Sequence, residues 1–436
     1  MKRPVIISLL IAALALVCLG IGAVILFTAN FNSFAGNNPF DRRNISSQVE
    51  ESKTLKVDPG KPVTLNVATD AGGVTVTGAD VETVQVKAIK TAYDSSQARA
   101  DAEVKNIKYT IEQSGNAITL KYELPKSMNI NNNVNTVDFV VTVPTETTAD
   151  INSSTGRVSV TGLQGQVAID NKFGDINIEK VDGALDVKTN SGGIDVSTVS
   201  AGKGNISLNS GFGTISLSQA SGAGVTAESN SGRLDIKNVR STQDMKLSSD
   251  FGNVKFDNGS AASLTVSTKS GSIDLSSVNI DGALVVNNDF GDIDLEQVKA
   301  ESYSLQTNSG SITVDGARGP MKAYTGFGNV TIQNAENATI DLNTKSGSID
   351  FAGSLGEGPH TVHSDFGEIS LSIPADSALN VDFKTDFGKI RSDIPFQVTM
   401  QGDLSEAQQQ GTMNGGGNEL TVSTKSGSIT IKDLGE

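Results

Sequence analysis

The sequence has few of the residue types that enzyme and metal sites usually need. Of its 436 residues, one is cysteine, two are histidine, none is tryptophan and 5% are aromatic. Cys18 alone forms neither an intrachain disulfide nor a thiolate metal cage. His360 and His363 lie three apart on an expected strand, so they face opposite sides and make no paired metal site or obvious triad. We expect no enzyme activity, no catalytic residues, no cofactor and no bound metal.

Positive charge is also scarce. Lys and Arg number 34 against 49 Asp and Glu, a formal net charge of −15, and no basic run follows the N-terminus. A nucleic-acid partner is therefore not expected. Some β-helical enzymes cleave acidic polysaccharides with charged residues clustered on one groove, but the repeat region's arginines do not cluster at one repeat position: Arg157, Arg233, Arg240, Arg318 and Arg391.

One long apolar run stands at the N-terminus, at residues 5–29. It is long enough to span a bilayer, which takes about 20 residues, whereas cleavable signal peptides have apolar cores of about 7–15. We predict a membrane anchor at residues 1–30 and a polar spacer at 31–52. Cleavage after the small-x-small site at residues 33–35 is the alternative.

The charges that flank this run set the expected orientation. Lys2 and Arg3 favour the cytoplasmic side, although Arg42 and Arg43 lie on the other flank, partly offset by Asp41. We expect a single-pass protein of the plasma membrane, with its N-terminus inside and the rest of the chain extracytoplasmic.

Two alternating glycine signatures fill the chain from about residue 150 onward. One places Phe before the glycine, and these phenylalanines are Phe173, Phe212, Phe251, Phe290, Phe327, Phe366 and Phe387. The other places Ser there, and these serines are Ser191, Ser231, Ser270, Ser309, Ser346 and Ser426. With Thr155-Gly156 as the first unit, they make 14 repeats of mostly about 20 residues.

Each repeat consists of two short apolar-alternating segments joined at the glycine. In the unit at residues 264–275, residues 264, 266, 268 and 270 share one face, and the apolar positions change parity after Gly271. Two strands joined by a corner cannot bury a face alone, but stacked coils share a core. The sequence therefore predicts an all-β fold: a single-chain β-solenoid (β-helix) of about 14 two-strand coils over residues 151–436.

The same alternation predicts that the phenylalanines point inward, since Phe290 shares parity with Leu284 and Val286. The alternative is an exposed aromatic stripe that stacks against a ligand. A polar row should also lie inside and form hydrogen-bonded ladders between like residues. Its members are Asn171, Thr189, Ser210, Ser229, Ser249, Thr268, Asn288, Thr307, Thr325 and Thr344.

Residues 53–150 are less regular and predict a β-rich cap over the solenoid's first coil. We expect strands at 63–67, 73–76 and 137–143, a helix at 95–106, and a hairpin over 107–124 that turns near Gly115. At the other end, residues 388–427 should form a looped terminal cap. Ile429-Thr-Ile431 should be an open edge guarded by Lys432, Asp433 and Glu436.

The acidic residues do not indicate a specific catalytic or metal-binding site. Asp-Phe-Gly occurs at Asp250, Asp289, Asp365 and Asp386, but without the other kinase motifs, so we read it as structural. Asp292 and Asp294 could belong to a calcium-binding carboxylate ladder. The acidic positions vary between coils, which favours solvated surface charge.

The repeated Ser-Gly and Phe-Gly units, the Val-Pro at residues 143–144 and the glycine cluster at residues 415–417 together resemble the bacterial putative-adhesin family, domains of unknown function with β-strand repeats. The resemblance covers about residues 55–432 and implies no catalytic residues. It favours a membrane-anchored surface binding module whose partners are cell-envelope or extracellular polymers or surface proteins. The alternatives are a scaffold that self-associates end to end at the membrane, and an extracytoplasmic regulatory partner.

Overall fold

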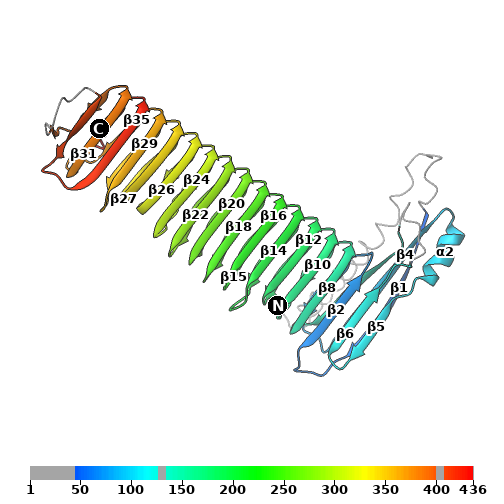
Figure 1. Cartoon of the computed structure of the whole chain (residues 1–436). Helices are drawn as coiled ribbons and strands as arrows, with labels where there is room; N and C mark the ends of the chain where they lie inside the picture. The colour runs from blue at the N-terminus through cyan, green and yellow to red at the C-terminus, as the bar shows by residue number, and fades with distance from the viewer. Residues whose placement is uncertain (1–44, 126–133, 399–406, 436) are drawn as a thin grey trace, which may run out of the picture.

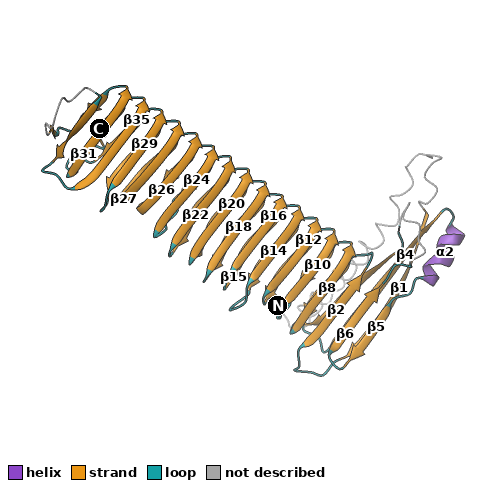
Figure 2. Cartoon of the chain, in the orientation of Figure 1, coloured by secondary structure: helices purple, strands orange, loops and turns teal. Residues whose placement is uncertain are grey.

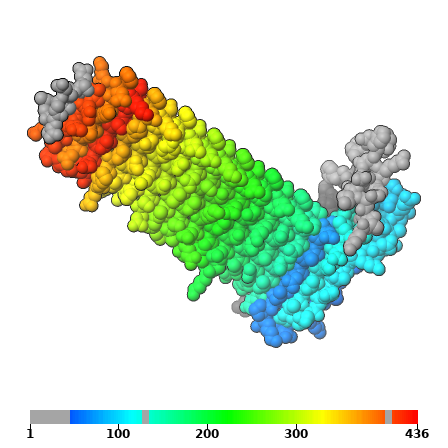
Figure 3. Space-filling view, viewed as in Figure 1, coloured from blue at the N-terminus to red at the C-terminus, as the bar shows by residue number. Residues whose placement is uncertain are grey.

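The computed structural model describes residues 45–125, 134–398 and 407–435. In these residues the chain is a long β-solenoid with a wider β-rich cap at one end (Figures 1 and 3). The predicted anchor and most of the predicted spacer lie outside the described residues. No helix within the described segments is long and apolar enough to cross a bilayer.

The solenoid has two faces made of parallel strands, and the chain passes from one face to the other at each glycine corner (Figure 2). The first face consists of β2 (Val63–Thr69), β8 (Thr147–Thr155), β10 (Val167–Phe173), β12 (Leu185–Ser191), β14 (Ile206–Phe212), β16 (Val225–Ser231), β18 (Asp244–Phe251), β20 (Ser263–Ser270), β22 (Ala283–Phe290), β24 (Ser302–Ser309), β26 (Arg318–Phe327), the second half of β27 (Val330–Ser346), β29 (His360–Phe366), β35 (Asn418–Ser426) and β31 (Leu379–Phe387).

The second face lies behind the first. It consists of β3 (Val74–Ala79), β9 (Val158–Thr161), β11 (Ile176–Asp182), β13 (Ile194–Ser200), β15 (Ile215–Gly222), β17 (Leu234–Ser241), β19 (Val254–Ala261), β21 (Ile273–Ile280), β23 (Ile293–Glu296), β25 (Ile312–Asp315), the first half of β27, β28 (Ile349–Leu355), β30 (Ile369–Ile373), β36 (Ile429–Asp433) and β32 (Ile390–Ser392).

The core lies between the two faces and follows the alternation in the sequence. In β20, Leu264 and Val266 are buried and pair in register with Leu284 and Val286 of β22. Across the corner, Ile273 is buried in β21. Because every turn repeats this pattern, apolar residues form continuous ladders along the stack. The prediction of an all-β solenoid of two-strand units is confirmed.

The number of turns differs from the predicted 14. The solenoid has about 11 turns, and we assign these to the units from Phe173-Gly174 to Phe366-Gly367, which stack in chain order. The unit at Gly156 instead joins the cap, because β8 and β9 also pair with β2 and β3. The last two units are stacked out of chain order. A count of glycine signatures therefore overestimates the number of turns that stack in chain order.

At the C-terminal end the chain reverses the order of its last two units. β35 lies between β29 and β31, and β36 lies between β30 and β32. The prediction that Ile429-Thr-Ile431 forms an open edge is therefore wrong, because β36 is paired on both sides. The end is covered on the first face by β34 (Gln408–Met413), which runs antiparallel to β31 and also pairs with β33 (Gln397–Val398).

The other end carries a β-rich cap. β6 (Ala117–Tyr122) pairs with β2 and forms a hairpin with β5 (Thr110–Ser114). β7 (Thr136–Pro144) pairs with β3, and β4 (Thr83–Asp94) and β1 (Ile45–Lys56) extend that side with antiparallel pairings. Helix α2 (Gln97–Asn106) packs on β1 and β4. The predicted strands, hairpin and helix are present, whereas β1 and β4 were not predicted.

Candidate functional site

The most unusual surface feature is a row of exposed phenylalanines along one corner of the solenoid. The exposed fractions of their side chains run from 57% at Phe173 to 79% at Phe387. The prediction that these rings fill the core is wrong, and the alternative of an exposed aromatic stripe is correct. The seven members are Phe173, Phe212, Phe251, Phe290, Phe327, Phe366 and Phe387.

The rings face outward because the alternation breaks one residue before each phenylalanine or serine. In β20, Thr268 is buried, but Lys269 and Ser270 are both exposed. The same step occurs in β22, where Asn288 is buried and both Asp289 and Phe290 are exposed. The corner thus begins before the glycine. The strict alternation that predicted an inward ring ends there, and the phenylalanine side chain lies on the outer side.

The corner is also too tight to hold a ring inside. Gly174 has φ +138°, and a Cβ added there would overlap the carbonyl oxygen of Gly156 in the preceding turn. Backbones of successive turns therefore touch at the corner. Only small polar side chains fit beneath them, and these form the inner row.

The inner polar row is buried as predicted, but its hydrogen-bond partners are different. Thr268 Oγ1 donates to the Gly252 carbonyl at 3.2 Å, and Asn288 Nδ2 donates to the carbonyls of Gly271 and Gly291 at 2.9 Å each. The ladder therefore runs from side chain to corner carbonyl rather than between like side chains. It satisfies backbone oxygens that water cannot reach, which holds the corner in one geometry.

Phe and Ser alternate along this corner in strict order. Ser270 pairs in register with Phe251 on one side and Phe290 on the other. The reversed order at the C-terminal end preserves the alternation, because β35 brings Ser426 between Phe366 and Phe387. Rings therefore recur every second turn, about 9.6 Å apart. We call this row of Phe and Ser residues the Phe–Ser edge.

A charged row flanks the Phe–Ser edge on the first face, one residue ahead of it. Over β18 to β31, aspartates accompany four of the five phenylalanines and lysines accompany three of the four serines; the exceptions are Gly326 before Phe327 and Asn308 before Ser309. The aspartates are Asp250, Asp289, Asp365 and Asp386, and the lysines are Lys269, Lys345 and Lys425. Within one molecule, Lys269 lies 2.8 Å from Asp250 and Lys425 lies 2.6 Å from Asp365. The Asp-Phe-Gly motif thus belongs to the surface pattern of the edge.

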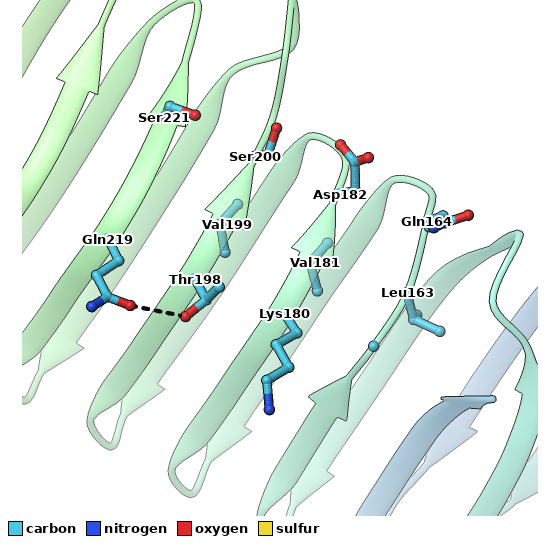
Figure 4. A pocket seen from close by; sticks show the side chains of 11 residues that line it. Leu163, Gln164, Lys180, Val181, Asp182, Thr198, Val199, Ser200, Gln219 and Ser221 are labelled. Atoms are coloured by element: carbon cyan, nitrogen blue, oxygen red, sulfur yellow. Dashed lines mark hydrogen bonds between the residues drawn. The ribbon is translucent and has the colours of Figure 1, made fainter.

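A second surface feature is a shallow groove of about 540 Å³ on the second face near the cap (Figure 4). Lys180, Thr198 and Gln219 line one side of it, with left-handed φ values of 56°, 56° and 52°. Each of these three residues faces outward, and so does the residue before it in the same strand, which makes a bulge that repeats from turn to turn. Thr198 Oγ1 donates to Gln219 Oε1 at 3.2 Å. The groove is open, its lining is a mixture of apolar and polar surface, and it lacks a concentrated charge.

The histidines face opposite sides, as predicted. His360 is buried, and burial lowers the pKa of its ring. His363 faces outward, with Nδ1 2.8 Å from Ser423 Oγ and Nε2 3.2 Å from Asp365 Oδ1. This contact was not predicted, because Ser423 is 60 residues away in the chain and reaches His363 only through the reversed order of the last units.

This Ser–His–Asp arrangement lacks the other parts of a hydrolase site. Ser423 lies in β35, whose backbone is paired with β29 and β31 on its two sides. The nearby N–H groups are thus engaged in the sheet and do not form an oxyanion hole. We interpret the cluster as a surface hydrogen-bond network.

The acidic residues likewise have structural partners. Asp292 Oδ1 accepts a 2.8 Å hydrogen bond from the Ser311 N–H of the next turn. Burial raises the pKa of Asp294, and its neighbours Asp274 and Asp292 add to that shift. Within the described segments, no cluster of three or more His, Cys, Asp or Glu side chains is suited to a metal ion.

Comparisons with known proteins identify the fold's relatives. A family described as Toastrack DUF4097 matches residues 74–277 and 258–432. Two solved structures are similar: a putative cell adhesion protein from Clostridium sporogenes ATCC 15579 and a putative adhesin from Bacteroides fragilis NCTC 9343. The first is 10% identical, covers 89% of this chain and 100% of its own, and has a TM-score of 0.18. The second is 12% identical, covers 88% and 98%, and has a TM-score of 0.21. A search of the curated proteins gave no significant match.

Proposed function

This chain belongs to the Toastrack DUF4097 family, and on that premise we propose that it is a membrane-anchored, extracytoplasmic adhesin that binds through the Phe–Ser edge and performs no catalysis. The observation that carries the proposal is the exposure of seven phenylalanines on one corner. A regular row of large exposed apolar side chains along one corner is a candidate interaction site.

The edge has the properties of a contact surface. Aromatic side chains are enriched at protein interfaces, and they bury a large area at a small cost in conformational entropy. The inner row hydrogen-bonds the corner carbonyls at most turns, with Thr189 as an exception, so the rings hold their spacing without a partner. A straight row of regularly spaced rings suits a partner that is itself extended, such as a polymer or another rod.

The membrane location rests on residues 5–29, whose length and apolar character suit a bilayer span. The described chain begins with β1 in the cap, at the opposite end of the rod from β31 (Figure 1). An anchor that precedes β1 would therefore leave the solenoid free to extend away from the membrane.

The test combines protease shaving of intact cells with binding to cell-envelope and extracellular polymers. Full-length protein should be cleaved or released from the outside, and it should bind at least one partner. Phe251→Ser, Phe290→Ser and Phe327→Ser combined should reduce this binding at least tenfold. Ile45→Ser with Val140→Ser is the matched control, because it removes exposed apolar side chains away from the edge. Protection from protease would overturn the location, and unchanged binding by the triple variant would overturn the contact surface.

A further inference from the structure

We infer that the Phe–Ser edge binds the Phe–Ser edge of a second copy of this chain, with the two rods antiparallel. This inference deepens the proposed function, since it names the partner of the same surface. The starting observation is the alternation of a large and a small residue in successive turns. On such an edge each ring is a projection and each serine leaves a gap, so a second copy shifted by one turn is complementary in shape.

A second copy matches this spacing without adjustment. The rings of both rods recur every two turns, about 9.6 Å apart, so each ring of one copy falls between two rings of the other. The first-face strands keep nearly the same direction from β10 to β35 (Figures 1 and 2), so the edge is close to straight. Two straight edges remain in contact over many turns.

The charged row decides the orientation. In the antiparallel dimer a twofold axis lies in the interface, perpendicular to the two rods. Rotation about this axis places the charged row of one copy opposite the charged row of the other. At the turns of Ser309 and Phe327 the flanking residues are uncharged, Asn308 and Gly326. At the other turns from β18 to β35 the flanking row carries Asp at phenylalanine turns and Lys at serine turns, so a phenylalanine turn that faces a serine turn there also sets Asp against Lys. In a parallel arrangement this row would instead face the row that follows the glycines, and the charge match would be lost.

One alignment pairs all the lysines of β18 to β35 with aspartates. The twofold axis then lies between the turns of Ser309 and Phe327. Asp250 faces Lys425 of the second copy, Lys269 faces its Asp365, and Asp289 faces its Lys345. Symmetry repeats each pair, which gives a closed dimer with the same surface on both sides. At the outer end of the overlap, Arg233 faces Lys389, a single unfavourable pair that symmetry also repeats.

The area is of the size that a specific dimer needs. The overlap contains five phenylalanines from each copy, from Phe251 to Phe387, plus Ser231 to Ser426 opposite them. Each ring exposes on the order of 100 Å² or more. The rings alone therefore contribute on the order of 500 Å² per copy, and the charged row adds to this toward the roughly 800 Å² of a standard interface.

The arrangement has a consequence for adhesion. In an antiparallel pair the two caps, and with them the N-terminal segments that precede β1, lie at opposite ends of the dimer. If residues 5–29 anchor each chain, the two anchors belong to facing membranes. The dimer would then join two cells that carry the same protein, and self-recognition would be the adhesive event.

Cysteine cross-linking of full-length protein in detergent tests the orientation and the alignment, with Cys18→Ala as the background. A mixture of Asp289→Cys chains and Lys345→Cys chains should cross-link with a short bismaleimide, whereas either variant alone should not. A mixture of Asp289→Cys and Ser311→Cys chains reports the parallel arrangement. Cross-links in the first mixture only would support the inference, and cross-links in the second mixture or in neither would overturn it.

A charge exchange adds a second readout. Lys345→Glu should lower the fraction of dimer in sedimentation at least fivefold, and adding Asp289→Lys to the same chain should restore it. Both sites are exposed, so neither change should affect folding. If dimers fail to form but the triple Phe→Ser variant still loses polymer binding, self-recognition is wrong and the proposed binding function stands. Dimers without any polymer binding would support self-recognition as the sole contact.

Discussion

Thr325 Oγ1 donates a 2.8 Å hydrogen bond to the carbonyl oxygen of Gly310, one turn earlier in the stack. Thr325 is buried, so this carbonyl has no access to water through that side. Thr325→Val keeps the shape and removes the donor, and it should lower the free energy of unfolding by about 1–3 kcal/mol in urea titrations. Thr265→Val, at an exposed site of β20, is the control and should change it by less than about 0.5 kcal/mol. Equal effects would contradict the role of the inner row.

Because the rings face outward, substitution of these phenylalanines should have little effect on the free energy of unfolding. Phe290 is 62% exposed, so Phe290→Ser should change the free energy of unfolding by less than about 0.5 kcal/mol. Phe256 is fully buried in β19, and Phe256→Ala should cost about 3–5 kcal/mol. Urea unfolding of the two variants separates an exposed row from a core row. If Phe290→Ser lowered the free energy of unfolding by several kcal/mol, the ring would have to pack in the core.

Most of the fold could be predicted from the sequence because every turn repeats the same requirement. Leu264, Val266 and Ile273 recur at equivalent positions in turn after turn, and that repetition outweighs the ambiguity of any single strand. The direction of Phe290 could not be predicted in the same way. It depends on where the alternation breaks, and one residue decides which side of the sheet the ring takes.

The order of the last units left a trace in the sequence. Phe366 and Phe387 are only 21 positions apart, with no serine unit between them, although such a unit separates every other pair of phenylalanines. Ser426 supplies the missing member by inserting in space between the two. Strict alternation, applied as a rule, would have predicted this insertion and with it the pairing of β36. The contact of His363 with Ser423 depends on the same insertion.

The corner glycines should tolerate no side chain. A Cβ at Gly174 would overlap the backbone carbonyl oxygen of Gly156, and φ is +138°. Gly174→Ala should therefore lower the free energy of unfolding by at least about 2 kcal/mol. Gly60 also has a positive φ, +72°, but no atom lies within 4 Å of an added Cβ. Gly60→Ala should cost about 1 kcal/mol, so the difference in urea unfolding measures the clash between turns.

The reversed order of the last units predicts an effect of truncation. Deleting residues 414–436 removes β35 and β36 and leaves β31 without its parallel partner. Residues 379–413 should then become sensitive to protease, with the cleavage sites identified by mass spectrometry. Ending the chain at Ile373 instead leaves β29 and β30 as the last turn, and the remaining solenoid should stay resistant. Continued protection of residues 379–413 in the first variant would mean that β31 stacks directly on β29.

The contacts of Asp365 predict how its contribution to stability changes with pH. A hydrogen bond from Lys425 Nζ at 2.6 Å, and then one with His363, lower the pKa of this carboxyl. A folded-state pKa below the unfolded value, about 3.9, contributes stability that is present above that value and is lost as the pH falls through the folded pKa. Asp365→Asn should therefore lower the melting temperature at neutral pH, where the carboxylate is charged. The difference from the parent protein should shrink as the pH falls below about 4 and vanish once the carboxyl is protonated in both states. Melting curves of the two proteins from neutral to acidic pH make the comparison, and a difference that persists unchanged in acid would assign the effect to packing rather than to charge.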